Sequence, residues 1–115
     1  MKPSLARLIA DNQLQRLDQF QFQGHASDDS GGRIYGGQVM AQALSASQQT
    51  VAQALTVHSM HVYFLRQGDP AKAVVYQVEP VRDGRSYCTR IVRALQDQQI
   101  IFTATLSFQK TEQGL

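Results

Sequence analysis

The sequence of 115 residues contains a single cysteine and has a formal net charge of only +2. One cysteine excludes an internal disulfide framework and is typical of a reducing compartment. The small net charge, without any cluster of lysine or arginine, argues against a nucleic-acid partner. No apolar run approaches the ~20 residues that a membrane span needs, and the N-terminal segment lacks the apolar core of a signal peptide. We therefore expect a cytoplasmic protein with no membrane span and no nucleic-acid partner.

The chain has the length of one domain, which buries about two-thirds of its unfolded surface. We predict a single domain over residues 1–115, with an amphipathic helix over about 1–18 and a central helix over about 37–51. The spacing of Phe20 and Phe22 predicts a short strand between the two helices. Strands follow from about residue 56 to 109, where β-branched and aromatic residues recur with a period of two.

The central helix is unusual because it contains no charged residue from Tyr35 to Val51. A helix on the surface of a domain normally presents one charged face to water. We therefore expect this helix to be covered on most of its sides. Two glycines, Gly36 and Gly37, are predicted to open it, with backbone N–H groups free to polarise a carbonyl or bind an anion.

Two turn signals predict how the last three strands pair. Asp83-Gly84 is typical of a two-residue hairpin turn, and a second turn is expected near Asp97-Gln98. The resulting register pairs Val78 with Thr89 in the first hairpin and Ile91 with Ala104 in the second. Both hairpins then place apolar residues on one face and Cys88 and Arg90 on the other, as expected for an antiparallel sheet packed on one side. The fold class is α+β, with an antiparallel sheet against a long helix.

Four motifs in a fixed order resemble the N-terminal half of type II acyl-CoA thioesterases. They are Tyr35-Gly36-Gly37-Gln38, the segment 57–66 followed by Gly68-Asp69, the segment 81–86, and Leu106-Ser107-Phe108-Gln109. The resemblance covers residues from about 20 to 109 and implies the hotdog fold, in which an antiparallel sheet wraps around a central helix. It also implies hydrolysis of fatty acyl-CoA to free fatty acid and CoA, as part of fatty acid metabolism. Coenzyme A then enters as part of the substrate, and no separate cofactor is expected.

The resemblance further implies that this chain is half of an enzyme. Family members carry two hotdog units, and their catalytic Asp, Ser/Thr and Gln come from the second one. At the corresponding places this chain has Thr56 on a strand and no carboxylate on the helix, which carries Ser45, Ser47, Gln48 and Gln49. We therefore expect a dimer, in which this unit pairs with a second copy or with a second hotdog domain.

The candidate site residues each have a structural alternative. Gly36 and Gly37 either polarise the thioester carbonyl, a contribution of about a hundred- to a thousandfold in rate for each donor, or allow the helix to approach a strand closely. Gln38 either points its amide into the same pocket or caps the helix. The two interpretations stay open for all three residues.

The histidines and arginines complete the set of candidates. His58 and His61 are expected on opposite faces of a strand, so they cannot share a metal site. His58 is the candidate general base, with a structural role as the alternative. Arg66 and Arg85 are candidates for binding the CoA phosphates, for which a guanidinium is well suited, although each also fits a solvated strand end. Cys88 is expected to be structural, and Asp28 with Asp29 lacks a third ligand for a metal.

Two other functions are weighed against a thioesterase unit. The first is a non-catalytic half that binds an acyl chain or CoA, or that only supports its partner. The second is a dehydratase or hydratase on the same fold, which would need a histidine and a carboxylate facing each other at the interface. The central helix offers no acid, so this alternative ranks last.

Overall fold

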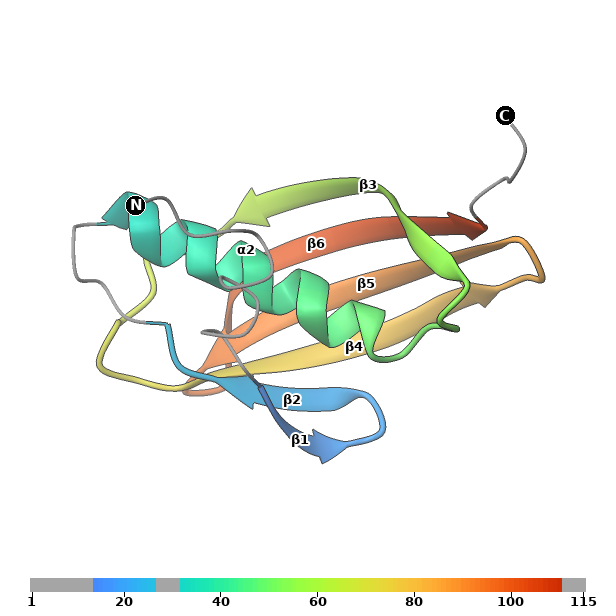
Figure 1. The fold of residues 1–115 in the computed structure, drawn as a ribbon. Coiled ribbons are helices and arrows are strands. Elements are labelled where there is room, and N and C mark those ends of the chain that lie inside the picture. The colour runs from blue at the N-terminus through green and yellow to red at the C-terminus, as the bar shows by residue number, and fades with distance from the viewer. Residues whose placement is uncertain (1–13, 27–31, 111–115) are drawn as a thin grey trace, which may run out of the picture.

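The computed structural model describes residues 14–26 and 32–110, and for residues 32–34 it describes the backbone alone. A six-stranded antiparallel sheet in the order β1-β2-β4-β5-β6-β3 lies against one long helix, α2 (Figure 1). The elements are β1 (Gln15–Asp18), β2 (Gln21–Gly24), α2 (Gly32–Gln48), β3 (Leu55–Phe64), β4 (Val74–Asp83), β5 (Tyr87–Gln96) and β6 (Gln99–Lys110). The predicted α+β architecture, with an antiparallel sheet against a long central helix, is confirmed.

The two predicted helices differ from the structure at their boundaries. Helix α2 covers Gly32–Gln48 rather than 37–51. It ends at Gln48 because the chain tightens there: the N–H of Thr50 donates to the Ser47 carbonyl at 3.0 Å and that of Val51 to the Gln48 carbonyl at 3.3 Å. Of the helix predicted over 1–18, residues 1–13 lie outside the described residues. Its last part is strand β1 (Gln15–Asp18), which pairs with β2.

The first predicted hairpin has the right position and the wrong register. Asp83 lies opposite Cys88, and the N–H of Gly84 donates to the Tyr87 carbonyl at 2.8 Å, so the chain turns at Arg85 and Ser86 rather than at Asp83 and Gly84. A bulge between Pro80 and Arg82 shifts the pairing again, at a proline that cannot donate to the ladder. Val78 therefore lies opposite Val92 and not opposite Thr89.

The second hairpin has the predicted turn but also a bulge. Asp97 and Gln98 have φ angles of 51° and 66°, as a two-residue turn with two left-handed residues requires. Beyond it, Leu95 pairs with Ile100 while Ala94 pairs with Phe102, so Ile101 is an extra residue. Ile91 therefore lies opposite Thr105 rather than Ala104.

The two register errors have one consequence, which is that the faces of β5 are exchanged. Cys88, Arg90, Val92 and Ala94 are buried, whereas Tyr87 is 61% exposed. The residues assigned to the inner faces of β4 and β6 are buried as predicted: Val74, Tyr76, Val78, Ala104, Leu106 and Phe108. A register shift of one residue turns every side chain of a strand to the other face of the sheet. The prediction is therefore wrong for all of β5 and correct for β4 and β6.

The part of α2 from Tyr35 onward, which carries no charge, makes buried polar contacts with the sheet. Gln42 is fully buried; its Oε1 accepts from the Tyr76 hydroxyl at 2.6 Å and its Nε2 donates to the His25 carbonyl at 3.2 Å. A Cβ on Gly24 would lie 2.5 Å from that Oε1, so the β2 backbone needs a glycine to approach the amide. Ser47, also buried, donates to the Leu44 carbonyl at 2.9 Å. The helix thus meets the sheet through neutral side chains that hydrogen-bond within the core.

A buried arginine fastens the end of α2 to the first hairpin. The Arg90 side chain is 3% exposed and lies 2.8 Å from the Asp83 carboxylate. Its Nε donates to Thr50 Oγ1 at 2.8 Å and its Nη2 donates to the Thr50 carbonyl at 2.9 Å. Arg90 therefore satisfies backbone and side-chain acceptors just beyond the helix C-terminus, a function that its assignment to the polar face did not predict.

Candidate functional site

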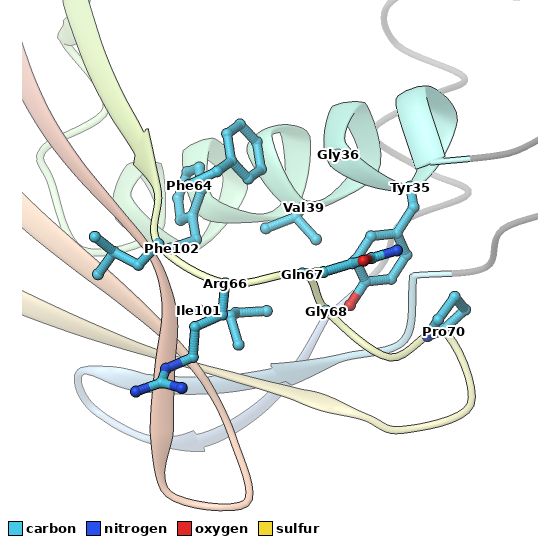
Figure 2. Close-up of a pocket in the computed structure, with 11 residues that line it drawn as sticks. Tyr35, Gly36, Val39, Phe64, Arg66, Gln67, Gly68, Pro70, Ile101 and Phe102 are labelled. Carbon is cyan, nitrogen blue, oxygen red and sulfur yellow. The ribbon is translucent and has the colours of Figure 1, made fainter.

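A cavity of about 350 Å³ opens beside the first turns of α2 (Figure 2). This volume lies within the range of small-molecule sites, about 300–1,000 Å³. The lining comes from α2, from the end of β3 with the loop that follows it, and from β6. The residues are Tyr35, Gly36, Val39, Phe64, Leu65, Arg66, Gln67, Gly68, Pro70, Ile101 and Phe102.

The lining has a buried floor and an exposed rim. Tyr35, Val39, Ile101 and Phe102 are at most 7% exposed and form the floor. Phe64 and Leu65 are 52% and 55% exposed, and they form the rim with the exposed Arg66 and Gln67. The Phe64 ring meets that of Phe102 edge-on, with centroids 5.1 Å apart. The cavity is therefore an apolar slot with Arg66 as the charged residue in its rim.

The loop after β3 is held firmly in place. The N–H groups of Leu65 and Arg66 both donate to the Ile101 carbonyl, at 2.8 and 3.2 Å, which uses the bulge in β6. Asp69 Oδ1 accepts from the N–H of Ala71 at 2.9 Å and so forms a local turn. His25 Nε2 lies 3.1 Å from the Pro70 carbonyl. The wall of the cavity is thus tied to β6 and to the end of β2.

Gln96 makes further contacts to this loop from the end of β5. Its side-chain oxygen accepts from the N–H of Asp69 at 2.8 Å, and its Nε2 donates to the carbonyls of Asp69 at 2.8 Å and Lys72 at 3.0 Å. The same Nε2 lies 3.3 Å from the Tyr35 hydroxyl. One buried amide therefore joins β5, the loop and the helix.

Tyr35 and Gly68 are in close contact on the floor of the cavity. A Cβ on Gly68 would lie 2.3 Å from the Tyr35 hydroxyl oxygen, so only glycine fits against this ring. Burial raises the pKa of the Tyr35 hydroxyl; the hydrogen bond from Gln96 lowers it, and the charge of Asp69 adds to the rise. Tyr35 is therefore a neutral hydrogen-bonding group at ordinary pH.

The structure brings two of the predicted site residues to the cavity. Gly36 and Arg66 line it, while Gly37 and Gln38 follow on the helix and lie outside the lining. Because α2 begins at Gly32, Gly36 and Gly37 lie one turn inside the helix, where N–H groups bond to carbonyls of the preceding turn. A Cβ on Gly36 would make only ordinary contact with Phe64 at 3.5 Å, and one on Gly37 would meet nothing within 4 Å. The N–H groups of Gly36 and Gly37 are therefore not at the start of the helix, where the prediction of free N–H groups required them to be.

His58 and Arg85 lie elsewhere. His58 is exposed and forms the extra residue of a bulge in β3, between Val57 and Ser59. The chain from there to Phe64 is extended, which separates His58 from the cavity by about 20 Å at 3.3 Å per residue. Arg85 is exposed in the β4–β5 loop, at the end of β5 opposite Gln96. Within this domain, Arg66 and Arg85 therefore cannot bind one phosphate group together.

Several other charged residues are paired with each other or lie outside the described residues. Arg93 pairs with Glu79 at 2.7 Å and the buried Arg90 pairs with Asp83. Asp28 and Asp29 lie outside the described residues, and within residues 14–26 and 32–110 no group of three His, Cys, Asp or Glu side chains could hold a metal. No helix in the described part of the chain is long and apolar enough to cross a membrane.

The exposed side of the cavity adjoins a row of apolar side chains at the sheet edge. Strand β3 pairs with β6 and, in the described part of the chain, has no strand on its other side. Exposed apolar side chains lie on β3 and just after it, namely Val57, Tyr63, Phe64 and Leu65, at 37%, 74%, 52% and 55%, and Met40 on α2 is 36% exposed. We call these five residues the β3 apolar edge.

A long helix packed against a six-stranded antiparallel sheet, with an apolar slot between helix and sheet, defines a hotdog-fold domain. Acyl-CoA thioesterase II TesB2 from Mycobacterium marinum has the same fold, with a TM-score of 0.84 and 35% identity over 97% of this chain and 41% of its own. The family model of the acyl-CoA thioesterase N-terminal domain matches residues 25–109. The chain belongs to this family, as its four motifs predicted.

Curated relatives of this chain are also acyl-CoA thioesterases, and they are much longer than this chain. Acyl-CoA thioesterase 2 of Haemophilus influenzae is 39% identical over 99% of this chain but only 40% of its own length. Acyl-coenzyme A thioesterase 8 of Mus musculus is 41% identical over 86% of this chain and 31% of its own length. The chain thus spans less than half of the curated relatives it matches.

Proposed function

We propose that this chain is one half of an acyl-CoA thioesterase, which hydrolyses fatty acyl-CoA to fatty acid and CoA with a second hotdog unit. The observation that carries the proposal is the slot itself, which is apolar in its floor and has Arg66 at its rim. An acyl chain fits such a floor because it gains from leaving water. A guanidinium at the rim suits a phosphate of CoA. Coenzyme A takes part as substrate, and no other cofactor is proposed.

The second unit is needed because the slot lacks acid–base groups. Of the described residues that line it, none carries a carboxylate or an imidazole. In the proposed reaction water adds to the thioester carbonyl, the C–S bond breaks, and the CoA thiolate takes up a proton. A group that accepts the proton of water is therefore supplied by the partner, in keeping with the catalytic trio expected on a second unit.

The β3 apolar edge is the surface proposed to meet that unit. A free strand edge with exposed apolar side chains is a liability that a partner removes. The edge begins at Phe64 and Leu65, which also form the rim of the slot, so a partner seated there would complete the slot. The greater length of the relatives supports a second domain, while a second copy of this chain would form a homodimer.

The test is acyl-CoA hydrolysis followed with a thiol-reactive dye that detects released CoA. We expect weak or no turnover by the 115-residue chain alone, and turnover when a polypeptide with a second hotdog unit is used. His58→Ala and Gln38→Ala test two predicted site residues that lie outside the slot of this unit, with Arg93→Ala as a matched control on the sheet. Full activity in both variants would show that neither residue takes part in the reaction. Absence of CoA release from every acyl-CoA, with and without a second unit, would refute the proposed reaction.

A non-catalytic half is the second candidate, favoured by the same lack of acid–base groups in the slot. It predicts saturable binding of acyl-CoA or CoA with no turnover in any assembly. The cytoplasmic location remains a prediction under either function.

A further inference from the structure

We propose that Tyr35 sets the length of the acyl chain that the slot accepts and that Gln96 is the positioning residue that holds the facing loop in place. This inference rests on the proposed function, because it assigns the slot to the acyl part of the substrate. It concerns the floor of the slot, which this chain builds by itself.

Tyr35 closes the floor from the helix side. Tyr35 is 7% exposed, and its ring reaches from α2 to Gly68 (Figure 2). A Cβ added to Gly68 would lie 2.3 Å from the Tyr35 hydroxyl oxygen. With Val39 and Ile101, the ring forms the buried lining of the cavity at this point. The terminal methyl of an acyl chain that enters past Phe64 would therefore stop at the Tyr35 ring.

Gln96 keeps this stop in position. Gln96 is 7% exposed. Its side-chain amide is hydrogen-bonded to the backbone N–H and the backbone carbonyl of Asp69, to the Lys72 carbonyl and to the Tyr35 hydroxyl. The four bonds reach three residues, two on the loop and one on the helix, so rotation of the amide or displacement of the loop breaks several at once. Since core packing and hydrogen-bonded walls deform little, the slot has a fixed depth and discriminates by length.

The two residues can be separated by conservative variants. Tyr35→Leu removes the ring and deepens the slot. Tyr35→Phe keeps the ring and loses only the 3.3 Å contact to Gln96, whose Nε2 retains the Asp69 and Lys72 carbonyls; it is the matched control. Gln96→Met preserves the length and volume of the side chain and removes every hydrogen bond to the loop.

The experiment measures binding of S-alkyl-CoA thioethers, which cannot be hydrolysed, by calorimetry on the folded protein. For the wild type, affinity should rise about fourfold with each methylene that enters the slot, from about 0.8 kcal/mol per buried CH₂, and then level off or fall at a limiting length. We expect that limit to move to longer chains in Tyr35→Leu and to become indistinct in Gln96→Met, while Tyr35→Phe keeps the wild-type limit.

Each outcome decides the matter. An unchanged limit in Tyr35→Leu, or affinity that does not depend on chain length in the wild type, overturns the inference. A uniform loss of affinity at all lengths in Gln96→Met would show a general loss of structure and overturn its positioning role. Length-dependent binding, together with no hydrolysis of acyl-CoA either with or without a second hotdog unit, would refute the proposed reaction and leave the length limit standing, so the two failures are distinguishable.

Discussion

The ion pair between the buried Arg90 and the exposed Asp83 makes the sharpest prediction about stability. Arg90 is 3% exposed in its side chain and Asp83 is 64% exposed. Asp83→Asn removes the carboxylate charge, keeps the shape, and leaves the guanidinium buried without an anionic partner. Arg90 would still donate to Thr50 and to the carbonyls of Arg82 and Thr89.

The magnitude lies between two limits. Removing one partner from a fully buried pair costs about 3–5 kcal/mol, because the remaining charge stays desolvated. An exposed pair contributes about 0.2–1 kcal/mol. One member here is buried and the other is mostly in water, so we expect Asp83→Asn to lower the free energy of unfolding by about 1–2 kcal/mol. With a urea m-value of about 2 kcal/mol/M, the middle of the usual range, the midpoint falls by roughly 0.5–1 M.

A double-mutant cycle is the assay, with Arg90→Met as the second change. Unfolding in urea is measured for the wild type, both single variants and the double variant at one protein concentration, because association would shift the midpoints. In the Arg90→Met background the Asp83→Asn change should cost almost nothing, which gives a coupling energy of about 1–2 kcal/mol. A coupling below about 0.5 kcal/mol, the ordinary limit of additivity, would show that the carbonyl groups alone compensate the buried charge.

Two further predictions concern buried groups that titrate. Burial raises the pKa of Tyr76 above its ordinary value, and the nearby Tyr35 adds to the rise. Above about pH 10 this tyrosine therefore ionises in the unfolded chain before it ionises in the folded one. The free energy of unfolding should fall there by about 1.4 kcal/mol per pH unit because of this residue. Tyr76→Phe should make that alkaline fall less steep, and an identical slope would contradict the assignment. Burial also raises the pKa of the Cys88 thiol, with Arg90 opposing and Asp83 adding to the rise, so a thiol reagent should label it only slowly in the folded protein and at once in denaturant. Rapid labelling of the native protein would show that the inner face of β5 opens readily.

The sequence was sufficient for the architecture because its strongest signals were long. The uncharged segment around Val39 predicted a covered helix, and the period of two after it predicted the sheet. What failed depended on single residues. The bulges at Val81 and Ile101 each insert one residue into a strand, and no composition signal distinguishes an inserted valine or isoleucine from a paired one.

The site was predictable only where a motif marked it. Gly36 and Arg66 belong to motifs of the family and both line the slot. Gln96 was missed because a glutamine near a turn reads as solvated surface, and only the folded chain brings it to Asp69. His58 was favoured on the assumption of an unbroken strand, whereas a bulge lies at that residue. Long-range contacts that a turn or bulge creates are the part that local patterns do not carry.

The strand order has a consequence for how the chain reaches its fold. Strand β3 follows the helix directly, yet its neighbour is β6, the last strand, with Leu55 opposite Lys110 and Phe64 opposite Phe102. During synthesis β3 must therefore wait until nearly the whole domain has emerged before it can pair. Contacts between segments so distant in sequence form slowly, and unpaired apolar strands are prone to aggregate in the meantime. If synthesis stopped before β6, the released chain would contain a β3 strand with no neighbouring strand on either side, although β3 carries exposed apolar side chains.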